Sequence, residues 1–301
     1  MPLWLKRFLR HTVRYPIEAF FTGALYLLGR SLPITWASSI GAFLLRSVGP
    51  LSKAHKTALK NLSWALPNLT DQERSNTVMG VWDNFGRVMG EYPNIYDIDF
   101  YNDDRIEVIG TDVIDQLKND GKPAIIFGAH LASWEVAIIA AAQRGLNMTQ
   151  MYRATNNPWV DKIVMYAQGR GKQNILTKGR GDAKNILDAL DDGTHFFILV
   201  DQKMNRGISV PFFGRDAMTA PAAARMAIKY NCPLVPAQVE RLGGFKFRVT
   251  YHPPIDIPDT GDAHADTKAA MVKVNQMIED WVRQHPDQWL WVHNRWPKDK
   301  K

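Results

Sequence analysis

The 301-residue chain has a single cysteine, Cys232. One cysteine excludes a disulfide framework within the chain and any zinc site built on several thiolates. Its sequence context, YNCPLVPA, is mostly apolar, so we expect the thiol to be a small buried group and not a nucleophile. The helical zinc motif His-Glu-x-x-His is also absent. We expect neither a metal nor another cofactor.

Signature motifs of several enzyme classes are missing as well. The sequence has no Gly-x-Ser-x-Gly elbow, no Walker phosphate-binding loop and no Gly-x-Gly-x-x-Gly fingerprint. These absences remove the usual support for a serine hydrolase, a nucleotidase or a dehydrogenase. The basic residues are scattered and belong to no recognisable nucleic-acid-binding module, so we expect no nucleic-acid partner.

No apolar run reaches the ~20 residues that a membrane-spanning helix needs. Two shorter runs, 16–29 and 32–45, are separated by Arg30 and Ser31, and one span through both would put Arg30 near mid-membrane at considerable cost. Basic residues flank the pair on both sides, so no charge asymmetry orients a span. We expect residues 1–48 to be a membrane-associating segment, an interfacial or re-entrant hairpin. A true span and an ordinary pair of core helices remain open alternatives.

The net charge of the chain favours an acidic or anionic partner. The formal net charge is +7 and the sequence pI is about 9.4, a balance that attracts anionic lipids and acidic proteins. The ten tryptophans suit a membrane interface or a binding groove, where one ring edge is apolar and the other wet. A tryptophan-filled core explains the same count equally well.

The spacing of apolar residues divides the rest of the chain into a helical part and an α/β part. Residues 49–104 form a helical lead-in, in which Thr70 and Glu73 have the spacing of a capping box. From 105 to 301, short apolar runs alternate with helical patterns. Examples are the expected strand PAIIFG (123–128) and the expected helix TAPAAARMAIKYN (219–231), with Pro221 in its first turn. The alternation predicts an α/β domain with a mixed, largely parallel sheet flanked by helices. In such sheets, sites lie beyond the carboxyl ends of the strands.

The stretch IIFGAHLASWEVAII, residues 125–139, holds one histidine and one glutamate in an otherwise apolar run. In a helix, five residues would separate His130 from Glu135 by ~140° around the axis. We therefore place His130 in the turn before the helix and expect Glu135 to reach back to its ring. The carboxylate would fix the tautomer and leave the other ring nitrogen free as a general base. The alternative is a structural histidine beside a solvated glutamate.

The sequence around this pair resembles a known family. GAHLASWE (128–135) is similar to the His-x4-Asp/Glu motif of membrane glycerolipid acyltransferases. Its glutamate form resembles the lipid A secondary acyltransferases, the lauroyl and myristoyl transferases of lipopolysaccharide synthesis. The same resemblance runs through MYRATNNP (151–158), LVDQKMNRGISVPFFGRDAMTAPAAARMA (199–227) and HPDQWLWVHNRWP (285–297). It covers most of the chain and includes the basic, apolar N-terminus.

The resemblance implies roles for individual residues. His130 would be the base and Glu135 its partner, Arg153 would help to hold the substrate or the thioester oxygen, and Asp201 would be an acidic residue of the substrate-binding site. Taken alone, Arg153 and Asp201 each end an expected strand. There Arg153 either binds a phosphate or forms a surface ion pair. Asp201 is either a catalytic carboxylate or part of a helix cap or ion pair. Arg180 lies in KGRGDAK at a helix start, which is either an anion-binding site or a solvated turn.

The remaining motifs carry weaker expectations. We assign no chemical role to Gln202 and Lys203. The alternating tryptophans of WLWVHNRW, residues 289–296, are interpreted as packing or interfacial anchoring, with substrate contact as the alternative.

The resemblance also implies a reaction. The protein would transfer a lauroyl- or myristoyl-like chain from acyl carrier protein to a hydroxyl of a lipid A precursor or related glycolipid. It would act at the cytoplasmic face of the bacterial inner membrane. Acyl carrier protein is acidic, and a basic surface would attract it. No acyl-enzyme is expected, because no activated serine or cysteine is evident. Two alternatives are another glycolipid or lysophospholipid acceptor, and a lipid-binding protein without turnover.

Overall fold

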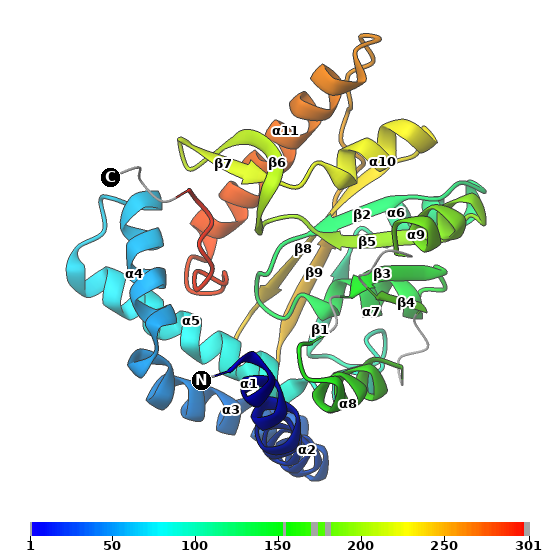
Figure 1. Cartoon of the computed structure of the whole chain (residues 1–301). Coiled ribbons are helices and arrows are strands. Elements are labelled where there is room, and N and C mark those ends of the chain that lie inside the picture. Colours follow the sequence, from blue (N-terminus) through cyan, green and yellow to red (C-terminus); the bar gives the residue numbers. More distant parts are fainter. Residues whose placement is uncertain (1, 153–154, 170–173, 178–181, 298–301) are drawn as a thin grey trace.

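The computed structural model of the protein describes residues 2–152, 155–169, 174–177 and 182–297 (Figure 1). In this part of the chain one sheet has seven strands in the order β1-β9-β8-β2-β5-β3-β4. All neighbouring strands are parallel except β8 and β9. The prediction of a mixed, largely parallel sheet is confirmed. The strands are β1 (Ile106–Ile109), β2 (Ile125–Gly128), β3 (Met148–Tyr152), β4 (Asn174–Thr177), β5 (His195–Leu199), β8 (Leu234–Arg241) and β9 (Phe247–Tyr251).

Helices cover both faces of this sheet (Figure 1). Side chains of α6 (Thr111–Asn119) and α7 (Glu135–Gln143) pack with Ile126 of β2 on one face. The other face carries α9 (Asp182–Asp191), α10 (Ala222–Tyr230) and α11 (Ala263–Gln284), which share a core with Ile125 and Phe127. Strand β2 is therefore buried on both sides, as its unbroken apolar run requires.

A separate antiparallel hairpin follows β5. Its strands are β6 (Lys203–Phe212) and β7 (Arg215–Thr219). The hairpin packs on α11, and Phe212 joins the core that lies beneath that helix. It extends from the carboxyl side of the sheet and connects β5 to α10.

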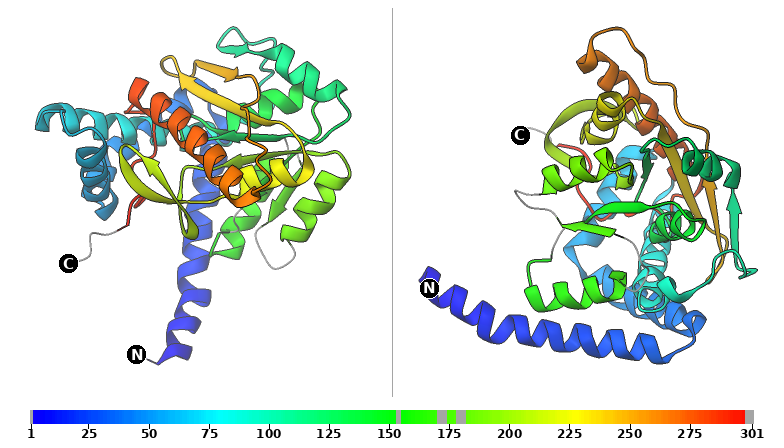
Figure 2. Two further views of the ribbon diagram at one scale, coloured as in Figure 1. Left: turned by 90° about the horizontal axis from the view of Figure 1, so that it is seen from above. Right: turned by 90° about the vertical axis from the view of Figure 1, so that its right-hand side faces the viewer.

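The N-terminal helices lie beside the sheet domain. α1 (Leu3–Leu9), the π-helical turn η1 (Arg10–Arg14) and α2 (Tyr15–Ser31) form one continuous rod that projects from the body (Figure 2). α8 (Pro158–Gly169) runs beside α2, and the Asn157 side chain donates to the Tyr15 carbonyl at 2.9 Å.

The second apolar run packs against a later helix. α3 (Ile34–Val48) lies along α5 (Asp71–Glu91). The two backbones approach so closely that a Cβ on Gly86 would lie 2.3 Å from the Gly41 carbonyl oxygen, so only glycine fits at this crossing. The helix α4 (Lys53–Ala65) and two 3₁₀ turns, η2 (Gly49–Leu51) and η3 (Ile95–Asp97), complete this part.

The outer surfaces of α2 and α3 are strongly apolar. Phe20 is 72% exposed and Phe43 is 70% exposed, and further large apolar side chains on both helices face solvent. Within the residues that the structure describes, no helix combines the length and the apolar character needed to cross a bilayer.

Candidate active site

The site lies where β2 and β5 end. These strands are parallel neighbours, with Gly128 paired to Leu199, so the residues that follow them emerge side by side from the same edge. After β2 the chain enters α7 on one face of the sheet, and after β5 it leads through the β6–β7 hairpin to α10 on the other face. The connections diverge at this point, which is where open α/β sheets form their binding crevice.

His130 and Asp201 meet at this crevice. The ring Nδ1 of His130 lies 2.8 Å from Asp201 Oδ1, and the His130 backbone N–H donates to Oδ2 at 2.9 Å. The side chain of Asp201 is 2% exposed and that of His130 is 17% exposed. The carboxylate is thus buried behind the ring, and the ring keeps one side toward the surface.

The charge state of Asp201 determines the tautomer of His130. Burial alone raises the pKa of Asp201, but the charge and hydrogen bonds of His130 and the Trp289 indole together outweigh burial and lower this pKa to about 2. Near neutral pH the carboxylate is ionised and can only accept hydrogen bonds. Nδ1 therefore carries the proton, and in the neutral ring Nε2 keeps its lone pair.

The expected pairing of Glu135 with the ring is wrong. Glu135 is buried at the start of α7, and its Oε2 accepts a hydrogen bond from the Tyr96 hydroxyl at 2.7 Å. Burial, followed by the charge of Glu135, raises the pKa of Tyr96 well above its ordinary value, so this phenol remains a donor. Strand adjacency brings Asp201 to the ring, whereas the first turn of α7 directs Glu135 toward η3.

The outer nitrogen of His130 faces a small pocket. The amide nitrogen of Gln202 lies 3.2 Å from Nε2, and it donates to the lone pair of the neutral ring. The Trp134 ring lies 5.1 Å from the imidazole, centroid to centroid. The pocket is lined by residues that follow β2 and β5 and by residues of the C-terminal segment: His130, Asp201, Gln202, Lys203, Trp289, Leu290, His293 and Arg295.

The C-terminal segment contributes a residue that the sequence interpretation missed. Trp289 Nε1 donates to Asp201 Oδ2 at 2.7 Å. The WLWVHNRW motif predicts packing or interfacial anchoring, with substrate contact as the alternative, and its alternation does not distinguish one tryptophan from the next. Nearby, burial followed by the charge of His130 lowers the pKa of His293. Burial lowers the pKa of Arg295 to about 10, so its guanidinium stays charged near neutral pH.

Other predicted site residues are placed as follows. Arg153 and Arg180 lie outside the described residues. Asp201, expected to contact substrate, is instead buried against the imidazole and the Trp289 indole. Cys232 is buried, as predicted, and burial raises the pKa of its thiol to about 11. Among the described residues, His, Cys, Asp and Glu form no cluster that could hold a metal ion.

Comparison with known proteins adds an independent observation. Residues 6–298 match the family described as bacterial lipid A biosynthesis acyltransferase. A lipid A biosynthesis acyltransferase of Haemophilus influenzae is 26% identical over 81% of this chain and 76% of its own length. The lipid A biosynthesis lauroyltransferase of Escherichia coli is 26% identical over 81% and 79%. The palmitoleoyltransferase of the same organism is 24% identical over 94% and 91%.

Proposed function

The chain belongs to the family of bacterial lipid A biosynthesis acyltransferases and is an acyltransferase, and from this premise we propose that it acylates a hydroxyl of a lipid A precursor. The donor is a fatty acyl thioester carried by acyl carrier protein, and the acyl group is of lauroyl or myristoyl size. The names of three relatives support the acceptor class. The net charge of +7 supports an acidic donor protein.

The single observation that carries the mechanism is the His130–Asp201 pair. In the proposed reaction, the acceptor hydroxyl replaces the Gln202 amide as the hydrogen-bond donor to His130 Nε2. Nε2 takes the hydroxyl proton while the oxygen attacks the thioester carbonyl, and the ionised Asp201 stabilises the imidazolium that forms. When the tetrahedral intermediate collapses, the thiolate leaves and receives that proton. No acyl-enzyme forms.

The oxyanion of the intermediate needs a positive or hydrogen-bonding partner. We retain Arg153 for this role, because a guanidinium can hold an oxyanion or a phosphate through paired N–H groups. Arg180 is proposed to hold a phosphate of the acceptor. Both assignments depend on the family resemblance of the flanking sequence.

Glu135 is proposed to position the site. Its hydrogen bond with Tyr96 ties the first turn of α7 to η3. This turn directly follows the loop that carries His130, so the pair would limit movement of that loop.

We further propose that α1, α2 and α3 rest on the cytoplasmic face of the inner membrane. The exposed aromatic residues of α2 and α3 would enter the interface between headgroups and acyl chains, where amphipathic side chains are stable. A lipid A precursor would then reach the base from the membrane surface.

The test uses the purified full-length chain in detergent. It combines acyl carrier protein bearing a labelled lauroyl or myristoyl group with a lipid A precursor. We expect one acyl chain to be transferred, and His130→Ala to lower kcat by about 10³-fold, within the range for a lost general base. His285→Ala is the matched control, because its ring also meets a carboxylate, Glu240, at 2.8 Å. This control should keep kcat within about threefold.

The other arms of the test address the remaining assignments. Acyl-coenzyme A replaces acyl carrier protein in one arm, and a lysophospholipid or another glycolipid replaces the acceptor in a second arm. Equal rates with either donor would remove the carrier-protein assignment, and a faster lysophospholipid reaction would remove the lipid A assignment. Lipid binding without transfer from any donor would make the protein a binding protein. Full activity of His130→Ala would overturn the mechanism.

A further inference from the structure

Two loops carry the groups that meet at Asp201. Residues 129–133 carry His130, and residues 286–290 carry Trp289. The loops pair as a short antiparallel ladder: Leu290 N donates to the His130 carbonyl at 3.0 Å, and Ala132 N donates to the Gln288 carbonyl at 3.0 Å. Any shift of one loop against the other therefore changes how His130 and Trp289 lie around the carboxylate.

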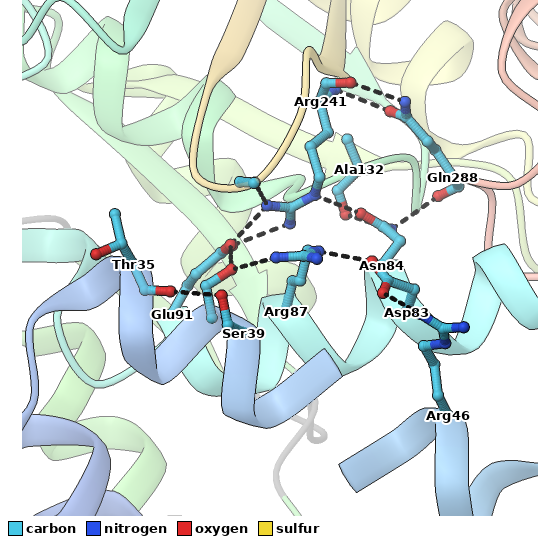
Figure 3. A network of polar contacts seen from close by, with 12 residues as sticks. Thr35, Ser39, Arg46, Asp83, Asn84, Arg87, Glu91, Ala132, Arg241 and Gln288 are labelled. Atoms are coloured by element: carbon cyan, nitrogen blue, oxygen red, sulfur yellow. Dashed lines mark hydrogen bonds and ion pairs between the residues drawn. The ribbon is translucent and has the colours of Figure 1, made fainter. Parts of the chain in front are cut away.

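Asn84 of α5 clamps this ladder from the side. Its side-chain nitrogen donates to the Ala132 carbonyl at 3.2 Å and to the Gln288 carbonyl at 3.1 Å. Figure 3 shows the amide between the two segments. Ala132 has φ +49°, a left-handed conformation that costs a non-glycine residue of order 1 kcal/mol. With both its N–H and its carbonyl hydrogen-bonded, the surrounding structure holds this conformation in place.

A buried ion pair fixes the orientation of the clamp. Arg241 Nε, at the end of β8, donates to Asn84 Oδ1 at 2.8 Å. A guanidinium can only donate, so it forces the oxygen of the amide toward itself and both N–H groups toward the loops. Arg241 is held in turn by both carboxylate oxygens of Glu91, at 2.5 and 3.0 Å, and this pair is buried (Figure 3).

Gln288 makes a second connection to the end of β8, through the backbone of Arg241. Its side-chain oxygen accepts from the Arg241 N–H at 2.8 Å, and its side-chain nitrogen donates to the Arg241 carbonyl at 3.0 Å. The Trp289 loop is therefore joined to β8 through Gln288 and to α5 through Asn84. Gln288 immediately precedes the tryptophan that donates to Asp201.

We infer that Asn84, oriented by Arg241 and Glu91, is a positioning residue for the His130–Asp201 pair. It touches neither the imidazole nor the carboxylate, and it acts by holding the two loops at one separation. This inference rests on the proposed function. A displacement of about 1 Å at a reacting group costs about 10²-fold in rate, so loss of the clamp should lower kcat far more than it changes substrate binding.

Asn84→Ala tests the inference, and Asn94→Ala is its matched control. Asn94 is equally buried, 7% exposed, and its amide makes the same set of contacts: two carbonyl acceptors, Gly29 and Leu32, and a guanidinium donor, Arg30. It makes no hydrogen bond to either loop. We expect similar losses in thermal stability, a 10- to 100-fold loss of kcat only for Asn84→Ala, and KM changes within about threefold for both.

One further variant keeps the inference testable if Asn84→Ala does not fold, and one spectroscopic measurement adds to the kinetics if it does fold. Gln288→Ala removes only the side-chain tie to Arg241 and should lower kcat about 3- to 10-fold. In folded protein, the proton resonance of His130 Nδ1–H, assigned by its loss in His130→Ala, should broaden in Asn84→Ala and stay unchanged in Asn94→Ala.

The outcomes separate this inference from the proposed function. An Asn84→Ala enzyme with wild-type kcat, or an equal loss of kcat in Asn94→Ala, overturns the positioning role while His130 remains the base. An unchanged Nδ1–H resonance in Asn84→Ala also overturns it. If His130→Ala itself is fully active, the proposed function fails first.

Discussion

Two buried carboxylates lie close to the His130 loop, and they face different partners. Asp201 follows β5 and accepts hydrogen bonds from the His130 backbone, from its ring and from the Trp289 indole. Glu135 begins α7 and accepts one from the Tyr96 phenol. In the proposed reaction, the ring that meets Asp201 would gain a proton, whereas the phenol that donates to Glu135 would keep its proton.

This difference shows how the fold brings a carboxylate to the ring of His130. Glu135 is near His130 in sequence, but the first turn of its helix directs it toward η3. Asp201 is 71 residues away, yet parallel pairing of β2 and β5 brings it to the ring. We therefore expect the chemistry to depend mainly on Asp201 and the local structure to depend on Glu135.

The largest expected effect comes from Asp201→Asn. An asparagine can turn its amide nitrogen toward Nδ1 and favour the tautomer with a proton on Nε2, which leaves no lone pair for the acceptor hydroxyl. We expect kcat to fall about 10³-fold or more, as for other orienting carboxylates of histidine bases. Steady-state transfer from acyl carrier protein measures this loss. A decrease of tenfold or less would remove Asp201 from the mechanism.

The next effect is the pH dependence of stability. The pKa of Asp201 is lowered from its ordinary 3.8 to about 2, so the folded protein favours the ionised form by about 2 kcal/mol. This contribution is present in full above the ordinary pKa and is lost as the pH falls through about 2. The difference in unfolding free energy between wild type and Asp201→Asn should therefore shrink steadily in denaturant titrations from pH 5 to pH 2.5. A constant difference would contradict the lowered pKa.

Much of the fold follows from the sequence because its signals are local. The apolar run at 123–128 and the helix after Pro221 require only neighbouring residues to be recognised, and both are present as β2 and α10. The β6–β7 hairpin was missed, since β6 is largely exposed and both strands lack the unbroken apolar run of a central strand.

The site was harder to predict for a physical reason. Sequence spacing predicts a role for His130, which stands out in an apolar turn. Its true partner depends on which strands are neighbours, and β5 is inserted between β2 and β3 although it follows both in the chain. Trp289 and Asn84 reach the site through contacts across the whole domain. No local pattern marks either residue.

A smaller effect is expected for Glu135→Gln. The glutamine side-chain oxygen can still accept from the Tyr96 hydroxyl, so the turn at the start of α7 should keep its geometry. We expect a loss of kcat of about tenfold or less, since only a positioning contact is weakened. Measuring this variant beside Asp201→Asn sharpens the comparison. A loss equal to that of Asp201→Asn would return Glu135 to the chemistry.

The smallest effect on rate is expected for Tyr96→Phe, which removes the hydroxyl that Glu135 accepts from. We expect a stability loss of about 1 kcal/mol, typical of one buried hydrogen bond. We expect a loss of kcat of no more than about threefold, because the loop that carries His130 keeps its hydrogen bonds to Gln288, Leu290 and Asn84. Tyr251→Phe is the matched control, because its buried hydroxyl donates to the Ala137 carbonyl in the same helix. Denaturant unfolding and steady-state transfer should show similar stability losses in both variants. If only Tyr96→Phe lowers kcat, and does so by 100-fold or more, the phenol–glutamate pair takes part in catalysis and the contrast between the two carboxylates fails.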